Sequence, residues 1–173
     1  MPTQFESFDI RQLCNESPFS LFFDRWALLT AGTHTAWNTM TVSGGQLGIL
    51  WSRNVATVYV RPQRHTLRFM DENEYFTLSF FDAAYKDALR FCGAHSGRDT
   101  DKAAATGLVP LFRSHAVWFE QAETVLVCRK LYRQPLSLAC FTDKTIAAQN
   151  YHNDYHIAFV GEITEAYRRS SAL

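Results

Sequence analysis

The segment from His34 to Gly45, HTAWNTMTVSGG, places hydroxyls, an amide and two glycines in succession. It follows the apolar run Trp26–Leu29, so the segment is expected to be a strand beside the core. Apolar side chains would be expected in such a strand, but this one is rich in polar groups. A strand of a barrel can, however, line a ligand groove with its outward face. The segment therefore indicates a binding surface with hydrogen-bonding groups along one strand.

Two other segments suit an anion. Arg61 to Thr66 (RPQRHT) gathers two arginines, a histidine and a hydroxyl at a predicted strand-to-helix turn. Ser96 to Lys102 (SGRDTDK) has a similar character, with small residues and then a predicted helix start flanked by Arg98 and Lys102. Arginine forks and the free N–H groups of a helix start suit phosphate oxygens, although a solvated turn or an ordinary capped helix has the same composition. With the hydroxyl-rich strand they predict a phosphorylated ligand: a nucleotide, a phosphosugar or a flavin mononucleotide (FMN).

Other catalytic and binding motifs are missing from the sequence. It contains no phosphate-binding loop of the P-loop type, no GxGxxG, no HExxH and no GxSxG. His152 and His156 are four residues apart, a ligand spacing on a helix. His156, however, opens an apolar strand (HIAFVGEI), which favours a polar contact at a strand end. We therefore predict no metal.

Composition limits the remaining classes. The 173 residues carry 17 basic and 17 acidic side chains, which argues against a general affinity for nucleic acid or for anionic membranes. No apolar run approaches the ~20 residues that span a bilayer. Cys14, Cys92, Cys128 and Cys140 form no CxxC pair and no secretory start follows Met1, so we expect reduced thiols in a cytoplasmic protein. The sequon at Asn15–Ser17 then has no meaning.

The elements that position these residues are mostly strands with hairpin-like joints. Strands are predicted at Trp26–Ala31, Thr39–Ser43, Val55–Val60, Tyr75–Phe81, Ala116–Phe119, Thr124–Leu131 and His156–Thr164. Helices are predicted at Leu67–Asn73 with Thr66 as cap, at Ala83–Cys92 stopped by Gly93, and at Asp101–Thr106, with a capping box from Ser96 to Asp99 and an end at Gly107. With no linker or repeat, residues 1–173 are predicted to form one domain, mainly β with a few short helices, a barrel or a sandwich.

Four ordered segments resemble one known family. HTAWNTMTVSGGQLGILW, VATVYVRPQRHT, FCGAHSGRDTDKAAATGL and YHIAFVGEI are similar to segments of the flavin reductase-like proteins, the FMN-binding split-barrel group, and especially to its flavoredoxin-type branch. The resemblance runs from about Phe22 to Tyr167, so the core of the predicted domain is residues 22–167, approximately. It implies a Greek-key split β-barrel, a homodimer, and FMN rather than FAD in a groove near the subunit interface.

The resemblance also implies the cofactor contacts. They are Asn38, Thr39, Met40, Thr41 and Ser43 on the strand, then Arg61, Gln63, Arg64 and Thr66 on the first turn, and Ser96, Arg98, Asp99 and Lys102 on the second. Backbone N–H groups and hydroxyls of the strand would bond the pyrimidine edge and stabilise the charge at N1 and O2 of reduced flavin. The two turns would meet phosphate and ribityl oxygens, with Lys102 as a phosphate partner.

Two positions depart from the pattern of the family. His156 matches a histidine near the cofactor and the nicotinamide path, and it is the one candidate catalytic residue. Relatives often place Gly-Asp before it, whereas here Asp154 and Tyr155 precede it. Gly44 stands where close relatives often carry a bulky aromatic residue. Its absence would open the flavin face or leave that face to the other subunit.

The leading functional hypothesis is an NAD(P)H-dependent flavin reductase. Reduced nicotinamide would pass hydride to flavin N5, and electrons would go on to a second acceptor, which includes an acceptor protein as a partner. Cys92 is expected in the core and not as a redox centre. The alternatives are a flavin-holding electron-transfer protein without efficient NAD(P)H reaction, and a split barrel that has lost flavin and binds another planar ligand such as haem.

Overall fold

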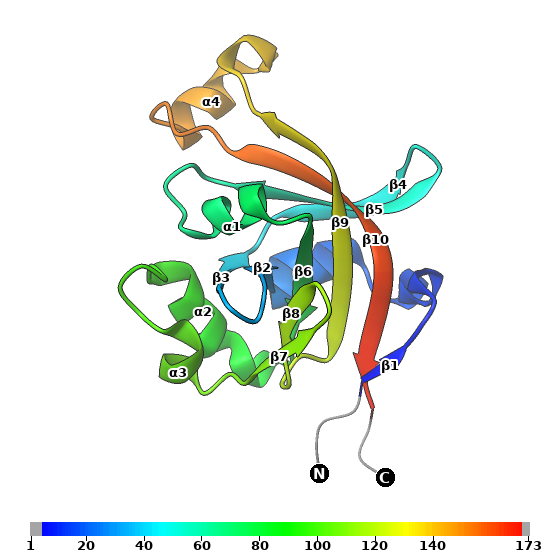
Figure 1. Cartoon of the computed structure of the whole chain (residues 1–173). Coiled ribbons are helices and arrows are strands. Elements are labelled where there is room, and N and C mark those ends of the chain that lie inside the picture. The colour runs from blue at the N-terminus through cyan, green and yellow to red at the C-terminus, as the bar shows by residue number, and fades with distance from the viewer. Residues whose placement is uncertain (1–4, 171–173) are drawn as a thin grey trace.

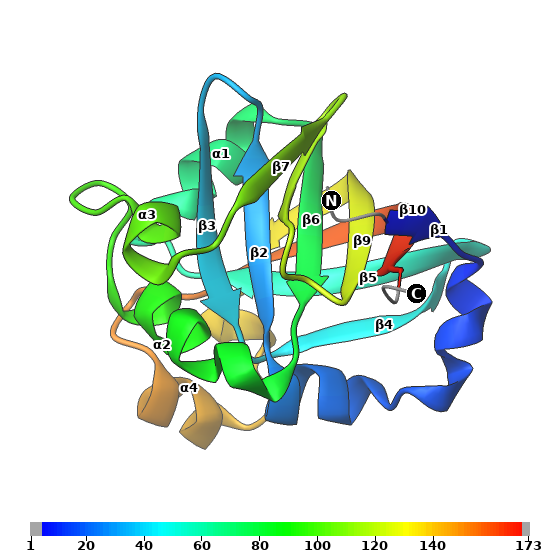
Figure 2. The same cartoon turned by 90° about the horizontal axis from the view of Figure 1, so that it is seen from below.

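The computed structural model describes residues 5–170, except the side chains of Cys14 and Asn15 (Figures 1 and 2). The predictions for the Cys14 thiol and for the sequon at Asn15 therefore lie outside the described residues. The strands are β1 (Phe5–Ser7), β2 (Ala27–Gly32), β3 (Trp37–Val42), β4 (Gly45–Leu50), β5 (Arg53–Val60), β6 (Tyr75–Phe80), β7 (Pro110–Arg113), β8 (Ala116–Phe119), β9 (Thr124–Pro135) and β10 (Ile157–Arg169). The helices are α1 (Thr66–Glu72), α2 (Lys86–Ala94), α3 (Lys102–Thr106) and α4 (Lys144–Asn150), with short turns η1 (Ile10–Asn15), η2 (Ser20–Arg25), η3 (Ala83–Tyr85) and η4 (Leu138–Cys140).

One large antiparallel sheet dominates the fold. Its strand order is β3-β2-β6-β9-β10-β5-β4, with β1 paired to β10, while β7 and β8 form a separate hairpin. In the described part of the chain the end strands β3 and β4 do not pair with each other, so the curved sheet is a split barrel and not a closed one. The predicted class, mainly β with a few short helices, is confirmed.

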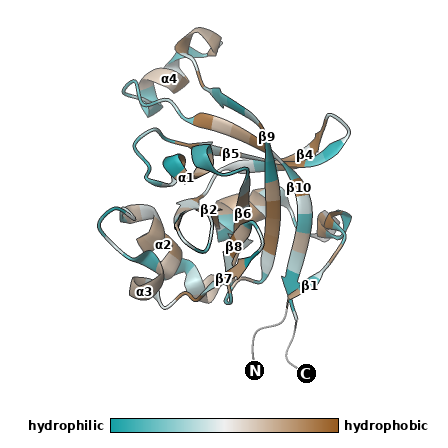
Figure 3. Cartoon of the chain, in the orientation of Figure 1, coloured by the Kyte–Doolittle hydropathy of each residue, from teal (hydrophilic) through white to brown (hydrophobic). Residues whose placement is uncertain are grey.

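The core lies between the layers of this curved sheet. Phe76, Phe80 and Phe159 are fully buried in one apolar cluster, and Trp118 and Phe119 lie in a second cluster between the sheet and the β7–β8 hairpin. Figure 3 shows that apolar residues predominate along the middle of β9, while the turn that leads into α1 is hydrophilic. Burial of these apolar side chains stabilises the sheet. The polar side chains of the turn are not part of this core.

The seven predicted strands are all present, and all except β8 have limits that differ from the predicted ones. The bounds of β8 are as predicted, but β9 continues to Pro135 and β10 to Arg169, and His156 lies just before β10. The predictions missed β1, β4, β7 and α4. β4 and β5 are joined by a two-residue hairpin turn, Trp51 and Ser52, and both residues have positive φ (51° and 56°). Asn-Gly is the usual sequence of such a turn, and it is absent here.

Two predicted helix ends are wrong. Thr66 is the first residue of α1 and does not cap it; His65 holds the cap position without a side-chain bond. Gly93 does not stop α2, because the helix continues to Ala94 and its cap residue is His95. A glycine stops a helix only when its backbone turns left-handed, and Gly93 is not among the positive-φ residues.

At α3 the end was predicted correctly and the beginning was not. Gly107, with φ 71°, ends the helix as expected. Asp101 provides the cap, because its Oδ1 accepts a 3.0 Å hydrogen bond from Ala104 N. The capping box from Ser96 to Asp99 is therefore wrong: those residues form the turn before the helix, where Asp99 N and Thr100 N donate to Ser96 O.

Two further structural facts concern thiols and membranes. Cys92, Cys128 and Cys140 are free, and burial raises the pKa of both Cys92 and Cys128. Cys92 lies in the core, as predicted.

Within residues 5–170 no helix combines the length and apolar character that crossing a bilayer requires.

Candidate functional site

A small cavity lies between the turn that precedes α1 and the loop that follows α2. We call it the cationic cavity; its volume is about 160 Å³. It is lined by Asn38, Met40, Gln63, Arg64, His65, Thr66, Ala94, His95, Ser96, Gly97, Arg98 and Lys102. This lining holds three basic side chains, two histidines and no carboxylate, although the whole chain has no formal net charge. Such a lining suits a compact anion.

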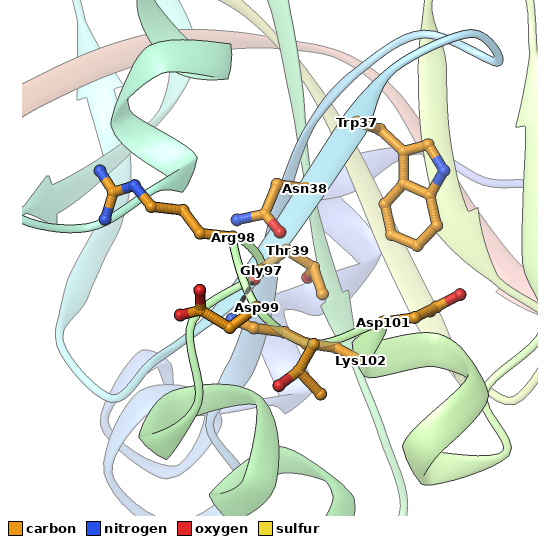
Figure 4. Close-up of a pocket in the computed structure, with 9 residues that line it drawn as sticks. Trp37, Asn38, Thr39, Gly97, Arg98, Asp99, Asp101 and Lys102 are labelled. Atoms are coloured by element: carbon orange, nitrogen blue, oxygen red, sulfur yellow. Dashed lines mark hydrogen bonds between the residues drawn. The ribbon is translucent and has the colours of Figure 1, made fainter.

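A second cavity, of about 460 Å³, adjoins the first. We call it the tryptophan cavity; its lining consists of Trp37, Asn38, Thr39 and the run from Gly97 to Lys102. Figure 4 shows Asn38 between the Trp37 indole on one side and Arg98 on the other. The two cavities share Asn38, Gly97, Arg98 and Lys102, so they lie next to each other on this part of the fold.

Asn38 joins the three segments that build these cavities. Its Nδ2 donates a 2.8 Å hydrogen bond to Thr66 Oγ1, and both side chains are buried. On its other side, a Cβ added to Gly97 would lie 1.9 Å from Asn38 Oδ1. Gly97 is therefore needed for the close approach of the loop to β3. β3, α1 and the loop after α2 meet at this one amide.

Lys102 ties α3 and α2 to the edge of β3. Its Nζ donates to Thr39 O at 2.8 Å and to Cys92 O at 2.7 Å, and the side chain is only 6% exposed. Burial lowers the pKa of Lys102 from its ordinary value. Two of its three donor positions are therefore occupied by backbone, while its charge still borders both cavities.

β3 presents backbone groups toward the helices. In the described chain it has β2 as its one strand neighbour, and Figure 2 shows α2 and α3 along its other side. Thr39 O bonds Lys102, so it points away from β2, and the N–H of a strand residue points to the same side as its carbonyl. The Thr39 N–H thus faces the tryptophan cavity side.

The strand hydroxyls already have protein partners. Thr39 Oγ1 lies 2.9 Å from Thr30 Oγ1 and 3.2 Å from Leu29 O, and Thr41 Oγ1 donates to Leu89 O. The protons of these hydroxyls are used inside the protein. The outward-facing backbone of β3 therefore remains to meet a ligand.

Two arginines are fixed at the cavity by backbone carbonyls. Arg64 Nη1 donates to Gly93 O at 2.7 Å, which connects the turn before α1 to α2. Arg98 Nη1 donates to Gln63 O at 3.3 Å, which connects the loop after α2 to the same turn. The two anion-suited turns, 35 residues apart in sequence, are thereby held together around one cavity.

Arg61 belongs to a different cluster. It pairs with Asp154 and donates to Asn150 O at 2.9 Å, and Gln63 Nε2 donates to Asp154 at 3.1 Å. The His152 N–H and the Arg61 guanidinium hold the pKa of Asp154 well below its usual range. This cluster fastens the segment that carries α4 to the turn at the cationic cavity.

His156 lies in this cluster and lines neither cavity. Its Nδ1 is 2.8 Å from Tyr151 OH, and burial, with the charge of Arg61, lowers the pKa of the ring from its ordinary value. His152 has no part in a metal cluster: within residues 5–170 no three His, Cys, Asp or Glu side chains are placed to hold an ion.

Most of the predicted cofactor residues come together. Those that line a cavity are Asn38, Thr39, Met40, Gln63, Arg64, Thr66, Ser96, Arg98, Asp99 and Lys102. Thr41, Ser43 and Arg61 line neither cavity. Sequence reasoning did not single out Trp37, His65 or His95, which do. His65 stood inside a quoted motif, but no spacing rule distinguished it from its neighbours.

Gly44 has open space around it. It is exposed, and a Cβ added there would have no heavy atom within 4 Å. The backbone thus leaves room for a Cβ at this position.

Comparisons with solved structures show the fold again. An FMN-binding domain of a flavin reductases-like enzyme from Shewanella baltica is 13% identical, with a TM-score of 0.69 over 97% of this chain and 78% of that chain. Flavoredoxin from Methanosarcina acetivorans is 21% identical, with a TM-score of 0.66 over 86% and 70%. An NADH:FAD oxidoreductase from Streptomyces globisporus, solved with NAD and FAD fragments, is 18% identical, with a TM-score of 0.60 over 84% and 77%.

The sequence gives the family. A comparison with curated protein sequences found no match. Residues 23–173, most of the chain, match the model of the flavin reductase like domain. The ordered segments, the split barrel and this match agree, and the chain belongs to the flavin reductase-like domain family.

Proposed function

We propose that the chain is an FMN-binding oxidoreductase that takes hydride from NAD(P)H and passes electrons to a second acceptor. The observation that carries the proposal is the cationic cavity, lined by Arg64, Arg98 and Lys102 and by no carboxylate, beside the open backbone edge of β3. A phosphorylated ring compound with a polar chain fits both features. Membership of the family supports flavin as that compound.

The cationic cavity favours FMN over FAD. A terminal phosphate monoester carries nearly two negative charges at pH 7, concentrated on three oxygens. A cavity of about 160 Å³ with three fixed cations matches that compact charge. In FAD the same phosphate carries only one charge, because it is linked to a second phosphate and an adenosine. That second part of the molecule would have to extend out of the cavity.

The protein contributes position and electrostatics. The Thr39 N–H and its neighbours on β3 would donate to the pyrimidine edge of the ring, in a backbone fixed by Lys102 and Asn38. Donors that are held in place stabilise a growing negative charge without reorganising. Bound FMN would supply the hydride chemistry at N5. The role proposed for His156 is a contact for nicotinamide.

The proposal also includes a homodimer, a cytoplasmic location and a protein among the electron acceptors. Exposed apolar side chains at the tip of the β4–β5 hairpin support the dimer: Ile49 is 71% and Trp51 56% exposed, and the Trp51 ring lies 6.3 Å from the Tyr132 ring on β9. Exposed apolar groups that lie together on a surface are typical of protein contacts. Light scattering on the purified chain measures the mass directly.

An absorption titration tests the function. The purified chain is titrated with FMN, and the loaded protein is then mixed anaerobically with NADH or NADPH in a stopped-flow spectrometer. Binding followed by bleaching of the flavin band is the expected result. Binding without bleaching by either nucleotide would overturn the reductase and favour the flavin-holding electron-transfer protein. A chain that binds no FMN would overturn the flavin site itself.

A further inference from the structure

His65 is a titratable side chain of the cationic cavity to which the proposed chemistry gives no part. It is half-buried at the start of α1, and its ring packs edge-on against Phe69, with centroids 5.3 Å apart and planes at 88°. Within the described chain neither of its ring nitrogens makes a hydrogen bond or an ion pair. An imidazole in such a place has two nitrogens to offer a ligand.

The charged and titratable groups around His65 come from the turn before α1, from α1, from the loop after α2 and from α3. They are Arg64 on its own turn, Arg68 on α1 (paired with Glu72), Arg98 and Asp99 on the loop after α2, Lys102 on α3, and the neighbouring titratable ring of His95 at the end of α2. Cations outnumber carboxylates in this set. A positively charged imidazole is therefore disfavoured while the cavity holds no anion.

The balance changes when an anion enters. Burial, then Arg98, Arg68 and Lys102, lower the pKa of His65 below 6.5, and Asp99 opposes them only in part. These surroundings thus favour the neutral ring before binding. A phosphate monoester brings nearly two negative charges into the same cavity, which favours the imidazolium. The charged ring then adds a positive charge and an N–H donor to those of the basic side chains that already line the cavity.

We propose that His65 binds the phosphate monoester as an imidazolium, so that the chain takes up a proton from solvent when the monoester enters the cationic cavity. This inference rests on the proposed function, because it takes FMN as the monoester. It adds a binding residue and a consequence: FMN affinity depends on pH through the protein. The N–H of the charged ring donates to a phosphate oxygen, and no bond of the ligand is made or broken.

The direction of the pH effect follows from linkage. If binding raises the pKa of His65, affinity increases as pH falls through the pKa of the bound state and levels off below that of the free state. The slope is at most about tenfold per pH unit for one proton. Below about pH 6 the phosphate itself gains a proton and the affinity stops rising. Riboflavin, which has no phosphate, should show neither effect.

Calorimetric titration in phosphate-free buffers of different ionisation enthalpy counts the protons. At pH 7.5 the chain should take up a measurable fraction of a proton with FMN and none with riboflavin. In His65→Gln and His65→Asn the uptake should vanish, and FMN affinity should fall several-fold at pH 6.5 but little at pH 8.5. His115→Gln is the matched control, because His115 packs on Tyr75 and lines neither cavity.

The outcomes separate the two proposals. FMN binding without proton uptake, or uptake that persists in both His65 variants, would overturn the role of His65 and leave the flavin site standing. Failure of both FMN and riboflavin to bind would overturn the proposed function, and this inference with it. The wild-type proton count does not depend on any variant folding.

Discussion

The Asn38 amide donates a 2.8 Å hydrogen bond to Thr66 Oγ1 in the interior of the protein, 28 residues along the chain. It joins the edge strand of the sheet to the first turn of α1, and it fixes the wall shared by the two cavities. A polar contact in this position contributes to both stability and binding.

We expect a double-mutant cycle to detect this bond. Asn38→Ala and Thr66→Val should each lower the free energy of unfolding by about 1–3 kcal/mol, because each leaves a buried polar partner unpaired. The double variant should lose less than the sum, with a coupling of about 0.5–1.5 kcal/mol. Urea unfolding measures all four proteins. Strict additivity would show that the bond does not stabilise the fold.

Gly97 should tolerate no side chain while Asn38 is present. An added Cβ would lie 1.9 Å from Asn38 Oδ1, so Gly97→Ala must displace the amide or the loop, at a cost of about 1–3 kcal/mol. FMN affinity should fall with it. Gly48→Ala is the control, since its Cβ meets nothing within 4 Å.

A second substitution makes this prediction sharper. Asn38→Ala removes the obstructing amide, so the pair Gly97→Ala with Asn38→Ala should be no less stable than Asn38→Ala alone. If Gly97→Ala destabilises both backgrounds equally, the strain lies elsewhere in the loop.

Lys102→Met should weaken the binding of riboflavin as well as of FMN. The ammonium holds Thr39 O and Cys92 O, so its loss frees the edge of β3 that would face the ring. The stability of the fold should change less than binding, because removing a buried charge offsets the lost bonds. Fluorescence titration with both flavins measures the effect, with exposed Lys144→Met as control. A loss confined to FMN would mean that Lys102 acts only on phosphate.

Asp154 should make the stability of the fold sensitive to acid. Its folded pKa is lower than the ordinary 3.8, so the unfolded chain binds the proton more readily. The stabilisation is present above about pH 4 and is lost as the pH falls further. Asp154→Asn should therefore be less stable than wild type at pH 6, and the difference should shrink at pH 3. Asp87→Asn is the control, because Asp87 lies in an exposed surface pair with Arg90.

The sequence predicted the strands best and the contacts least. Runs such as Val55–Val60 and Tyr75–Phe80 combine β-branched or aromatic residues with clear ends, and local pattern is enough to find them. β4 was missed because Trp51 and Ser52 turn with positive φ although neither is a typical residue for that turn. Its strand GQLGIL is short of β-branched residues as well.

The candidate site was half visible in the sequence. The arginines and the small-residue turn indicated an anion, because their chemistry is local. Nothing in the sequence showed that Arg61 would turn away to Asp154, 93 residues later, or that Lys102 would bond two backbone carbonyls. Such partners depend on which segments the fold brings together, and spacing along the chain does not encode that.

The position of β3 at the end of the sheet has a consequence for solubility. An end strand with open backbone groups is a template for pairing with another molecule, and proteins usually block it. Here Lys102 holds the Thr39 carbonyl, and α2 and α3 flank the strand. Lys102, α2 and α3, which border the backbone groups proposed to receive the ligand, therefore also keep neighbouring molecules from pairing with this strand. Damage to this edge would first appear as aggregation, before any change in melting temperature.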